Sequence, residues 1–201
     1  MASTLERMGF KVPEEKVCRS FVGPPLKKRF LELFDADEGT ANAVVTAFRE
    51  EYGKGDLFLA ERYPGMEECL RALHGRHPLA VATNKREDHA TMLLERYGMA
   101  SHFDSICGSA AVAAMTKDQI VANAAERMGF CLSDCLMVGD SDNDAEAAAR
   151  LGVPFVGVTY GYGFKCAADL APFPHLACAH SPSEICAVLE RLNREGTGNH
   201  G

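Results

Sequence analysis

The stretch from Leu136 to Ala145 constrains the fold of this chain more than any other. The apolar residues Leu-Met-Val lead to Gly139, the polar residues 140–144 follow, and a helical pattern of small apolar residues begins at Ala145. This order is typical of a buried strand that stops at a turn and opens a helix. In an open α/β sheet such a turn lies at the carboxyl end of a strand, where ligands bind. We therefore expect a ligand site here.

Three carboxylates crowd into this turn. They belong to Asp140, Asp142 and Asp144. Carboxylates this close repel one another unless a cation neutralises them. Ser141, with Asp144 three residues later, also fits a helix cap, and we expect capping to occur as well. A cap does not account for Asp140, which precedes it, so the turn predicts a cation site.

Strands and helices alternate from the Tyr63-Pro64-Gly65 turn onward. Short apolar segments are followed by helical patterns, and Thr116 and Ser181 begin capping boxes that open two of the helices. The expected strands are 78–83, 103–107, 135–139 and 154–159, with an edge strand at 176–179. This pattern predicts an α/β fold with a parallel sheet and helices on both faces.

The first third of the chain has a helical pattern. Apolar residues recur at helical spacing between residues 3 and 52, no segment there reads as a buried strand, and Gly23-Pro24-Pro25 marks a turn. We expect these short amphipathic helices to pack on one another. The predicted organisation is a helical domain over 1–62, an α/β core over 63–195 and a flexible tail over 196–201.

Composition narrows the functional classes. With 47% hydrophobic and 24% charged residues among 201, the chain has the composition of a soluble globular protein. The net charge of −7 gives no indication of nucleic acid or an anionic membrane as a partner. Eight cysteines without a C-x-x-C pair favour free thiols in a reducing cytoplasm. A zinc site at Cys131 and Cys135 would lack partner ligands.

Three motifs in order give the chain a family resemblance. Gly139-Asp140-Ser141-x-x-Asp144 resembles the fourth motif of the haloacid dehalogenase (HAD) superfamily of phosphohydrolases. Thr83 at its strand end and Lys117 at its helix start resemble the second and third motifs. Taken alone, Thr83 fits a strand-end cap and Lys117 a solvated side chain, so the combination carries the resemblance.

Other segments resemble the phosphoglycolate-phosphatase-like members of that superfamily. Val158–Gly163 is similar to the loop after the next strand, Phe21–Leu26 to the cap, and Tyr63–Gly65 to the return into the core. The resemblance implies a HAD-like Rossmannoid core with a small all-α cap of the C1 type. It also implies that a phosphomonoester is hydrolysed through an aspartyl-phosphate, with Mg²⁺ as cofactor. Phosphoglycolate is the substrate it suggests, and other small phosphorylated metabolites remain open.

The resemblance also assigns roles to residues. Asp140 would hold Mg²⁺, and Asp144 would bind it or orient a metal-bound water. Thr83 and Asn84 would hold phosphoryl oxygens, and Lys117 would offset the charge of the nucleophile and the phosphate. Oxygen ligands of this kind suit Mg²⁺ better than a softer ion.

The nucleophile of the family is not found. Its motif places Asp-x-Asp-Gly-Thr after a buried strand, and Phe34–Thr40 comes near this pattern. We reject that segment because Glu38 separates the second Asp from the Gly, and because residues 27–33 are charged and have helical periodicity. A loop with Asp or Thr as helix caps explains these residues. The resemblance thus implies that the first core strand and its nucleophile are missing.

The missing strand would be the middle one, between the strands that end at Thr83 and Gly139. Its loss would leave two unpaired inner edges, which would collapse together or remain poorly ordered. Three interpretations stay open: an incomplete phosphatase, an inactive relative that binds phosphate ligands or a protein partner, and an enzyme that recruits Asp35 and Asp37. The last requires a strand before Asp35. A Rossmann-type nucleotide binder is disfavoured because no G-x-G-x-x-G follows a strand.

Overall fold

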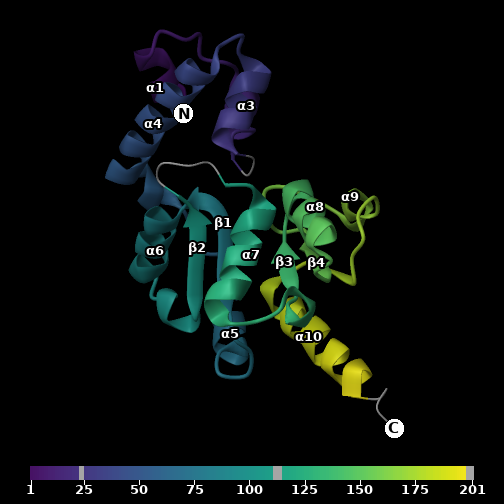
Figure 1. The fold of residues 1–201 in the computed structure, drawn as a ribbon. Helices are drawn as coiled ribbons and strands as arrows, with labels where there is room; N and C mark the ends of the chain where they lie inside the picture. Colours follow the sequence, from purple (N-terminus) through teal and green to yellow (C-terminus); the bar gives the residue numbers. More distant parts are fainter. Residues whose placement is uncertain (23–24, 111–114, 198–201) are drawn as a thin grey trace. The chain divides into compact units, whose positions relative to one another are not determined.

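The computed structural model describes residues 1–22, 25–110 and 115–197, and the chain divides into two compact units. The first unit is Met1–Glu61 and the second is Arg62–Gly201. The described part of the first unit is helical, whereas the second combines parallel strands with helices (Figure 1). Within the described ranges, no helix has the length and apolarity that crossing a bilayer requires.

The first unit has the predicted helical packing. Its helices are α1 (Ala2–Arg7), α2 (Glu15–Arg19), α3 (Leu26–Leu33) and α4 (Glu38–Lys54), followed by the 3-10 helix η1 (Asp56–Leu59). Leu5, Phe30 and Val44 are fully buried where their apolar faces meet. The ring of Phe30 stacks on Phe34 at 4.8 Å and meets Phe10 edge-on at 5.2 Å. Gly23 and Pro24 of the predicted turn lie outside the described residues.

The loop between α3 and α4 carries the Asp residues that come near the nucleophile motif. Helix α3 runs to Leu33, so a helix and not a strand precedes Asp35. The carboxylate of Asp37 accepts a hydrogen bond from the backbone N–H of Thr40 at 2.6 Å and caps α4. The prediction of a capped loop between helices is confirmed. Recruitment of Asp35 and Asp37 as the catalytic carboxylates requires a strand before Asp35, and this condition is not met.

The second unit alternates strands and helices, as predicted. Its strands are β1 (Ala80–Arg86), β2 (Ser105–Ser109), β3 (Met137–Gly139), β4 (Phe155–Val158) and β5 (Ala177–Ala179). Its helices are α5 (Met66–Leu73), α6 (Glu87–Arg96), α7 (Lys117–Met128), α8 (Asp142–Leu151), α9 (Ala167–Leu170) and α10 (Pro182–Thr197), with 3-10 helices η2 (Ala100–His102) and η3 (Leu132–Asp134). Because α10 extends to Thr197, residues 196 and 197 are helical and not tail. Residues 198–201 lie outside the described part.

The described strands form two parallel sheets instead of one. β1 pairs with β2 in one sheet, and β4 lies between β3 and β5 in the other. Among the described residues β1 and β3 do not pair with each other, so each has an unpaired inner edge. Both remain regular strands. The expectation that these two edges would collapse together or lose their order is therefore wrong.

Helices cover both faces of the sheet formed by β3, β4 and β5, because its strands are apolar on both sides. Phe155 of β4 packs with Ala145 of α8. Val158 points to the opposite face by strand alternation, and packs with Leu73 of α5 and Ile185 of α10. In Figure 1, α7 and α8 lie side by side in front of the strands. The predicted arrangement of helices on both faces is confirmed.

The carboxyl end of β1 differs from its prediction. The sequence predicts that this strand ends at Thr83 and that a helix follows from Arg86. The ladder instead continues to Arg86, which pairs with Ser109 after an irregularity that begins at Thr83. Helix α6 starts one residue later, at Glu87. Pairing with β2 thus extends the strand beyond Thr83, where the sequence predicts its end.

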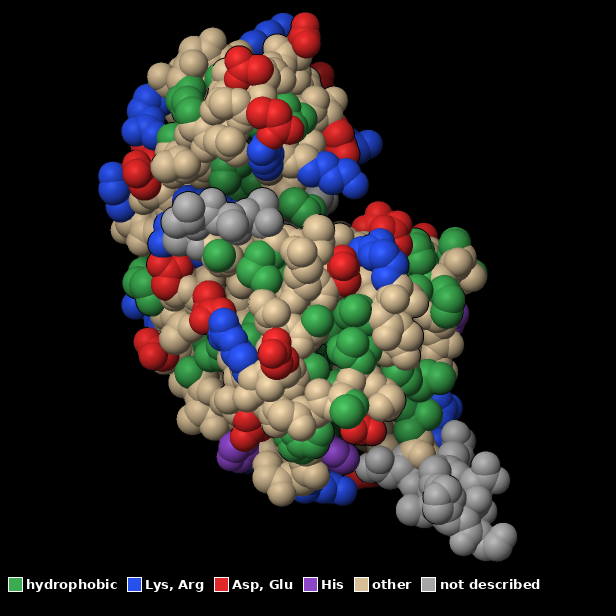
Figure 2. Space-filling model, viewed as in Figure 1, with side chains coloured by type: hydrophobic (Ala, Val, Ile, Leu, Met, Phe, Trp, Pro, Cys, Tyr) green, Lys and Arg blue, Asp and Glu red, His purple; other side chains and the backbone are tan. Residues whose placement is uncertain are grey.

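Charged side chains of both signs are interspersed on the surface. Figure 2 shows Lys and Arg side chains next to Asp and Glu on the face in view. Exposed ion pairs along helices, such as Arg71 with Glu67 and Arg150 with Glu146, contribute to this mixture. The net charge of −7 is therefore not gathered into one patch on this face.

Candidate active site

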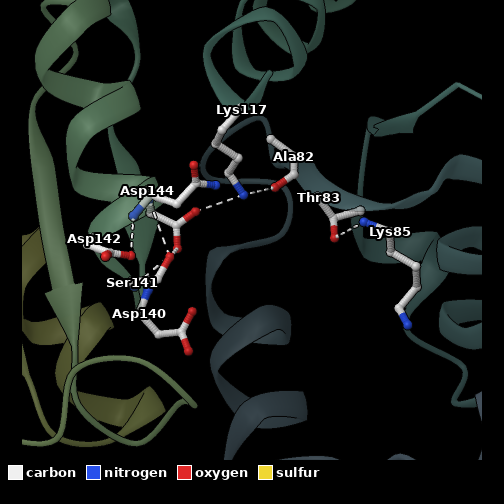
Figure 3. Close-up of polar contacts among 9 residues, drawn as sticks. Ala82, Thr83, Lys85, Lys117, Asp140, Ser141, Asp142 and Asp144 are labelled. Atoms are coloured by element: carbon white, nitrogen blue, oxygen red, sulfur yellow. Dashed lines mark hydrogen bonds and ion pairs between the residues drawn. The ribbon is translucent and has the colours of Figure 1, made fainter. Parts of the chain in front are cut away.

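Lys117 connects β1 with the first turn of α8, which follows β3. The predicted capping box of Thr116 and Gln119 starts α7 and makes Lys117 its first residue. The Lys117 ammonium donates to the backbone carbonyl of Ala82 at 2.7 Å and lies 2.8 Å from Oδ1 of Asp144 (Figure 3). Both charged side chains are only 9% exposed. A buried charge is tolerated when it is paired and hydrogen-bonded, and this pair meets both conditions.

Asp144 uses its other oxygen to close the turn that begins α8. Oδ2 accepts hydrogen bonds from the backbone N–H groups of Asp140 and Ser141, both at 3.2 Å, and from the Ser141 hydroxyl at 2.7 Å. The Ser141 hydroxyl oxygen accepts in return from the backbone N–H of Asp144 at 3.3 Å. The expected cap is confirmed, and both carboxylate oxygens of Asp144 have donors. A direct bond from Asp144 to a metal ion would have to replace one of them.

Asp140 follows β3 and is held by the loop after β4. Its Oδ2 accepts hydrogen bonds from the backbone N–H of Tyr162 at 2.6 Å and of Gly163 at 3.2 Å. A Cβ on Gly161 or Gly163 would collide with Asp140, so only glycine permits this close approach of the loop. Within the described residues no donor meets Oδ1 of Asp140. That oxygen is therefore available to a cation.

Two tyrosines that the sequence analysis did not single out lie near Asp140. The rings of Tyr63 and Tyr160 meet edge-on, with their centroids 5.1 Å apart. Burial, reinforced by the nearby Cys69, Tyr63 and Asp140 groups, raises the pKa of Tyr160 to about 12. Burial also raises the pKa of Tyr63, with Tyr162 and Asp140 adding to the effect. Both phenols are therefore neutral at neutral pH. The repeated tyrosines in the loop after β4 were the available signal.

Thr83 and Asn84 are placed differently from the predicted anion site. Both belong to strand β1 and not to the start of a helix. The Thr83 hydroxyl oxygen accepts a hydrogen bond from the backbone N–H of Lys85 at 3.2 Å. Thr83 directly follows Ala82, whose carbonyl binds Lys117 (Figure 3). The predicted position of Thr83 at the end of its strand is wrong, because β1 continues to Arg86, whereas the role of these two residues toward phosphate stays a prediction.

Asn143 is a further candidate site residue that the sequence analysis did not name. It lies in the first turn of α8, between Asp142 and Asp144. Its Nδ2 is buried and has no hydrogen-bond partner among the described residues. Unpaired buried amide donors are uncommon in folded proteins. Its position inside the acidic turn was the signal available in the sequence.

The predicted site residues lie apart from a hollow in the second unit. That hollow has a volume of about 620 Å³ and lies against β2, α6 and α7, where Glu87, Cys107 and Arg127 line it. None of the predicted site residues lines it. In the described ranges there is also no group of three or more His, Cys, Asp or Glu side chains suited to hold a metal. A metal here would thus rely on few protein carboxylates.

Sequence relatives point to one family. Residues 1–158 match the model of the haloacid dehalogenase-like hydrolases. The chain is 33% identical to a 5′-nucleotidase from Pseudomonas aeruginosa over 192 residues. This match covers 94% of this chain and 83% of that protein. It is also 33% identical to a phosphoglycolate phosphatase from Neisseria meningitidis over 167 residues. This match covers 79% of this chain and 71% of that protein.

A solved structure supports the same assignment. The crystal structure of a predicted phosphatase from Clostridium acetobutylicum matches with a TM-score of 0.86 and 30% identity, over 94% of this chain and 88% of that one. The fold match and the sequence matches therefore point to the same family. The chain belongs to the haloacid dehalogenase-like hydrolase family.

Proposed function

We propose that this chain is the scaffold of a Mg²⁺-dependent phosphomonoester hydrolase that acts on a small organic phosphate in the cytoplasm. The observation that carries the proposal is the meeting of Lys117, Asp144 and Asp140 at the carboxyl ends of β1 and β3. Phosphoryl transfer depends mainly on positioning and charge stabilisation, which a fixed cation and fixed carboxylates provide. The names of the relatives, a 5′-nucleotidase and a phosphoglycolate phosphatase, support the same class of reaction.

Asp140 fits Mg²⁺ better than Asp144 does. Proteins bind Mg²⁺ through one or two carboxylates, while water and phosphate oxygens complete its shell. Backbone donors fix Oδ2 of Asp140, and Oδ1 is free of donors within the described residues. Asp144 would act through a bound water, because both of its oxygens are engaged. The bound ion would neutralise charge on the phosphate.

Lys117 would contribute the second positive charge of the site. An ammonium group has three donors. Ala82 and Asp144 engage two of them, which leaves one for a phosphoryl oxygen or an attacking carboxylate. Thr83 and Asn84, the next residues along β1, would add a hydroxyl and an amide to the site.

The two units would have different roles. We assign residues 1–62 to a helical cap of the C1 type and 63–195 to the catalytic core. The helical cluster around Phe30 gives the first unit an apolar core of its own, which a separate cap requires. The proposed Mg²⁺ and phosphate ligands all lie in the second unit.

The attacking carboxylate would not be among residues 1–201, and the strand that carries it would lie between β1 and β3. A central parallel strand is normally buried on both faces. All residues of β1 are only half-buried, and Val138 of β3 is 40% exposed. The ammonium of Lys117 binds the carbonyl of Ala82. A strand in this position would pair with both inner edges.

Mg²⁺-dependent phosphate release tests the proposal. The 201-residue chain is assayed beside a version extended upstream in its native reading frame, with p-nitrophenyl phosphate and phosphoglycolate. We expect activity in the extended version alone, and its loss in Asp140→Ala. Asp35→Ala is the matched control and should remain active, because Asp35 lies in an exposed loop between helices. Activity of the short chain that Asp35→Ala abolishes would overturn the proposal. Phosphate binding without hydrolysis by either version would favour an inactive relative.

A nucleoside 5′-monophosphate is the second candidate substrate. The relative named 5′-nucleotidase covers 94% of this chain, against 79% for the phosphoglycolate phosphatase. The ratio of kcat/KM for the two substrates in the extended version decides between them. A higher value for phosphoglycolate would support the substrate that the motif resemblance suggests.

A further inference from the structure

Two cysteines distant in the sequence touch inside the second unit. Cys69 lies on α5 and Cys186 lies on α10 (Figure 1), and both cysteines belong to the apolar cluster that contains Val158 of β4 and Ala179 of β5. The thiol of Cys186 donates a hydrogen bond to Sγ of Cys69, and the two sulfur atoms are 3.4 Å apart. The residues are 117 positions apart in the chain, and both are free thiols. The fold thus brings two oxidisable thiols into direct contact.

The two thiols differ in their access to solvent. Cys69 is 4% exposed and packs with Leu73 and Ile185. Cys186 is half-buried and borders a hollow of about 30 Å³, which Arg76 also lines. Cys186, the more exposed of the two thiols, is therefore the one that a reagent in solution meets first. Cys69 is shielded from the same reagent.

We propose that Cys69 and Cys186 form a reversible disulfide when the chain meets a low-molecular-weight disulfide such as oxidised glutathione. A disulfide requires a sulfur–sulfur distance of about 2.05 Å. The two sulfurs must therefore approach by roughly 1.4 Å from their 3.4 Å contact. Helices α5 and α10 already pack against each other, so the distance to be closed is short.

The reaction proceeds in two exchange steps. Cys186, as thiolate, attacks one sulfur of the reagent, which forms a mixed disulfide and releases one small thiol. Cys69 then gives up its proton and attacks Sγ of Cys186, which releases the second small thiol. In total, two protein thiols are oxidised to one disulfide, and the reagent is reduced to two thiols. Burial, the largest cause, raises the pKa of Cys69 and persists in the mixed disulfide, so the second step should be the slow one.

The disulfide would tie the first helix of the second unit to its last described helix. Closing a loop of this length removes conformational freedom from the unfolded chain, which stabilises the folded state. The bond would lie next to Tyr160 and at a distance from Lys117, whose partners are on the other sheet and on α8. We therefore expect a gain in thermal stability as its main effect.

Oxidation of the full 201-residue chain tests the inference. The folded chain is incubated with oxidised glutathione, its remaining thiols are alkylated, and peptides are mapped by mass spectrometry. We expect a peptide that links Cys69 to Cys186, and a rise in Tm of roughly 5–10 °C that dithiothreitol reverses. Cys186→Ala should lack the rise. Cys131→Ala, which removes an exposed cysteine, should keep it.

Two outcomes would overturn the inference. One is a stable mixed disulfide at Cys186 while Cys69 remains open to alkylation in the unfolded chain. The other is a linked peptide without any rise in Tm, which would mean that strain in the folded state cancels the gain from restraining the unfolded chain. If Cys186→Ala fails to fold, Cys186→Ser serves instead, and the peptide map of the unsubstituted chain decides by itself.

Discussion

Replacing Lys117 by Met removes the charge between the two sheets and keeps most of the side-chain volume. The change leaves Oδ1 of Asp144 and the carbonyl of Ala82 without the donor that each has now. Water replaces that donor poorly, because the two charged side chains are only 9% exposed. Removal of one partner of a buried ion pair costs about 3–5 kcal/mol. Asp144 keeps its donors at Oδ2, so we expect the lower end, about 3 kcal/mol of unfolding free energy.

Urea unfolding followed by circular dichroism measures this loss. The midpoint should fall at an unchanged m-value, and in thermal unfolding about 3 kcal/mol corresponds to a Tm lower by roughly 6–12 °C. The matched control is Arg71→Met, which breaks a pair with Glu67 whose side chains are 65% and 43% exposed. An exposed pair contributes little, so this control should change the unfolding free energy by less than about 0.5 kcal/mol.

A double variant separates the ion pair from the packing of its two side chains. Combining Lys117→Met with Asp144→Asn removes the carboxylate charge that the single variant leaves unpaired. We expect a coupling free energy of at least about 1 kcal/mol between the two positions. The reasoning is refuted if Lys117→Met costs no more than Arg71→Met, or if the two single effects simply add.

Three further changes test other parts of the structure. Gly139→Ala would place a Cβ 2.5 Å from Cβ of Asp144, and should lower the unfolding free energy by about 1–3 kcal/mol in urea unfolding. Phe30→Ala should lower the stability of the first unit by about 3–5 kcal/mol, which hydrogen exchange of its peptides measures. Asp37→Ala should weaken α4, and this loss should depend on pH. The hydrogen bond from Thr40 lowers the pKa of Asp37 below its ordinary 3.8 in the folded state. The stabilisation of the folded state by this cap is therefore fully present above pH 3.8, the ordinary pKa of Asp. It disappears as the pH falls through the lower pKa of Asp37 in the folded state. Below that pH the unsubstituted chain and Asp37→Ala should be equally stable.

Each of these changes has a control in the same chain. Gly55→Ala adds a Cβ that meets no atom within 4 Å and should be nearly neutral. Val12→Ala removes methyl groups from a side chain that is 38% exposed, in contrast to the fully buried Phe30. Asp35→Ala removes an exposed carboxylate from the loop that also contains Asp37. A control as destabilising as its partner would show that the named contact is not the cause.

Local signals predicted much of the fold. The apolar run before Gly139, the caps at Thr116 and Ser141, and the helical spacing of the first third all act within one or two turns of chain. The same local reasoning rejected Asp35 and Asp37, because a helical pattern precedes them. Local signals failed at Thr83, where pairing with β2 extends the strand past a turn signal to Arg86.

The sequence by itself determined the order of strands, helices and motifs, because those depend on neighbouring residues. Tertiary structure alone decided which groups meet. The contact of Lys117 with Ala82 spans 35 positions, that of Tyr162 with Asp140 spans 22, and that of Cys186 with Cys69 spans 117. The division into two sheets is of the same kind, since strand pairing joins residues far apart in the chain. Such contacts depend on how the whole chain packs, and no periodicity or cap of one segment specifies its distant partner.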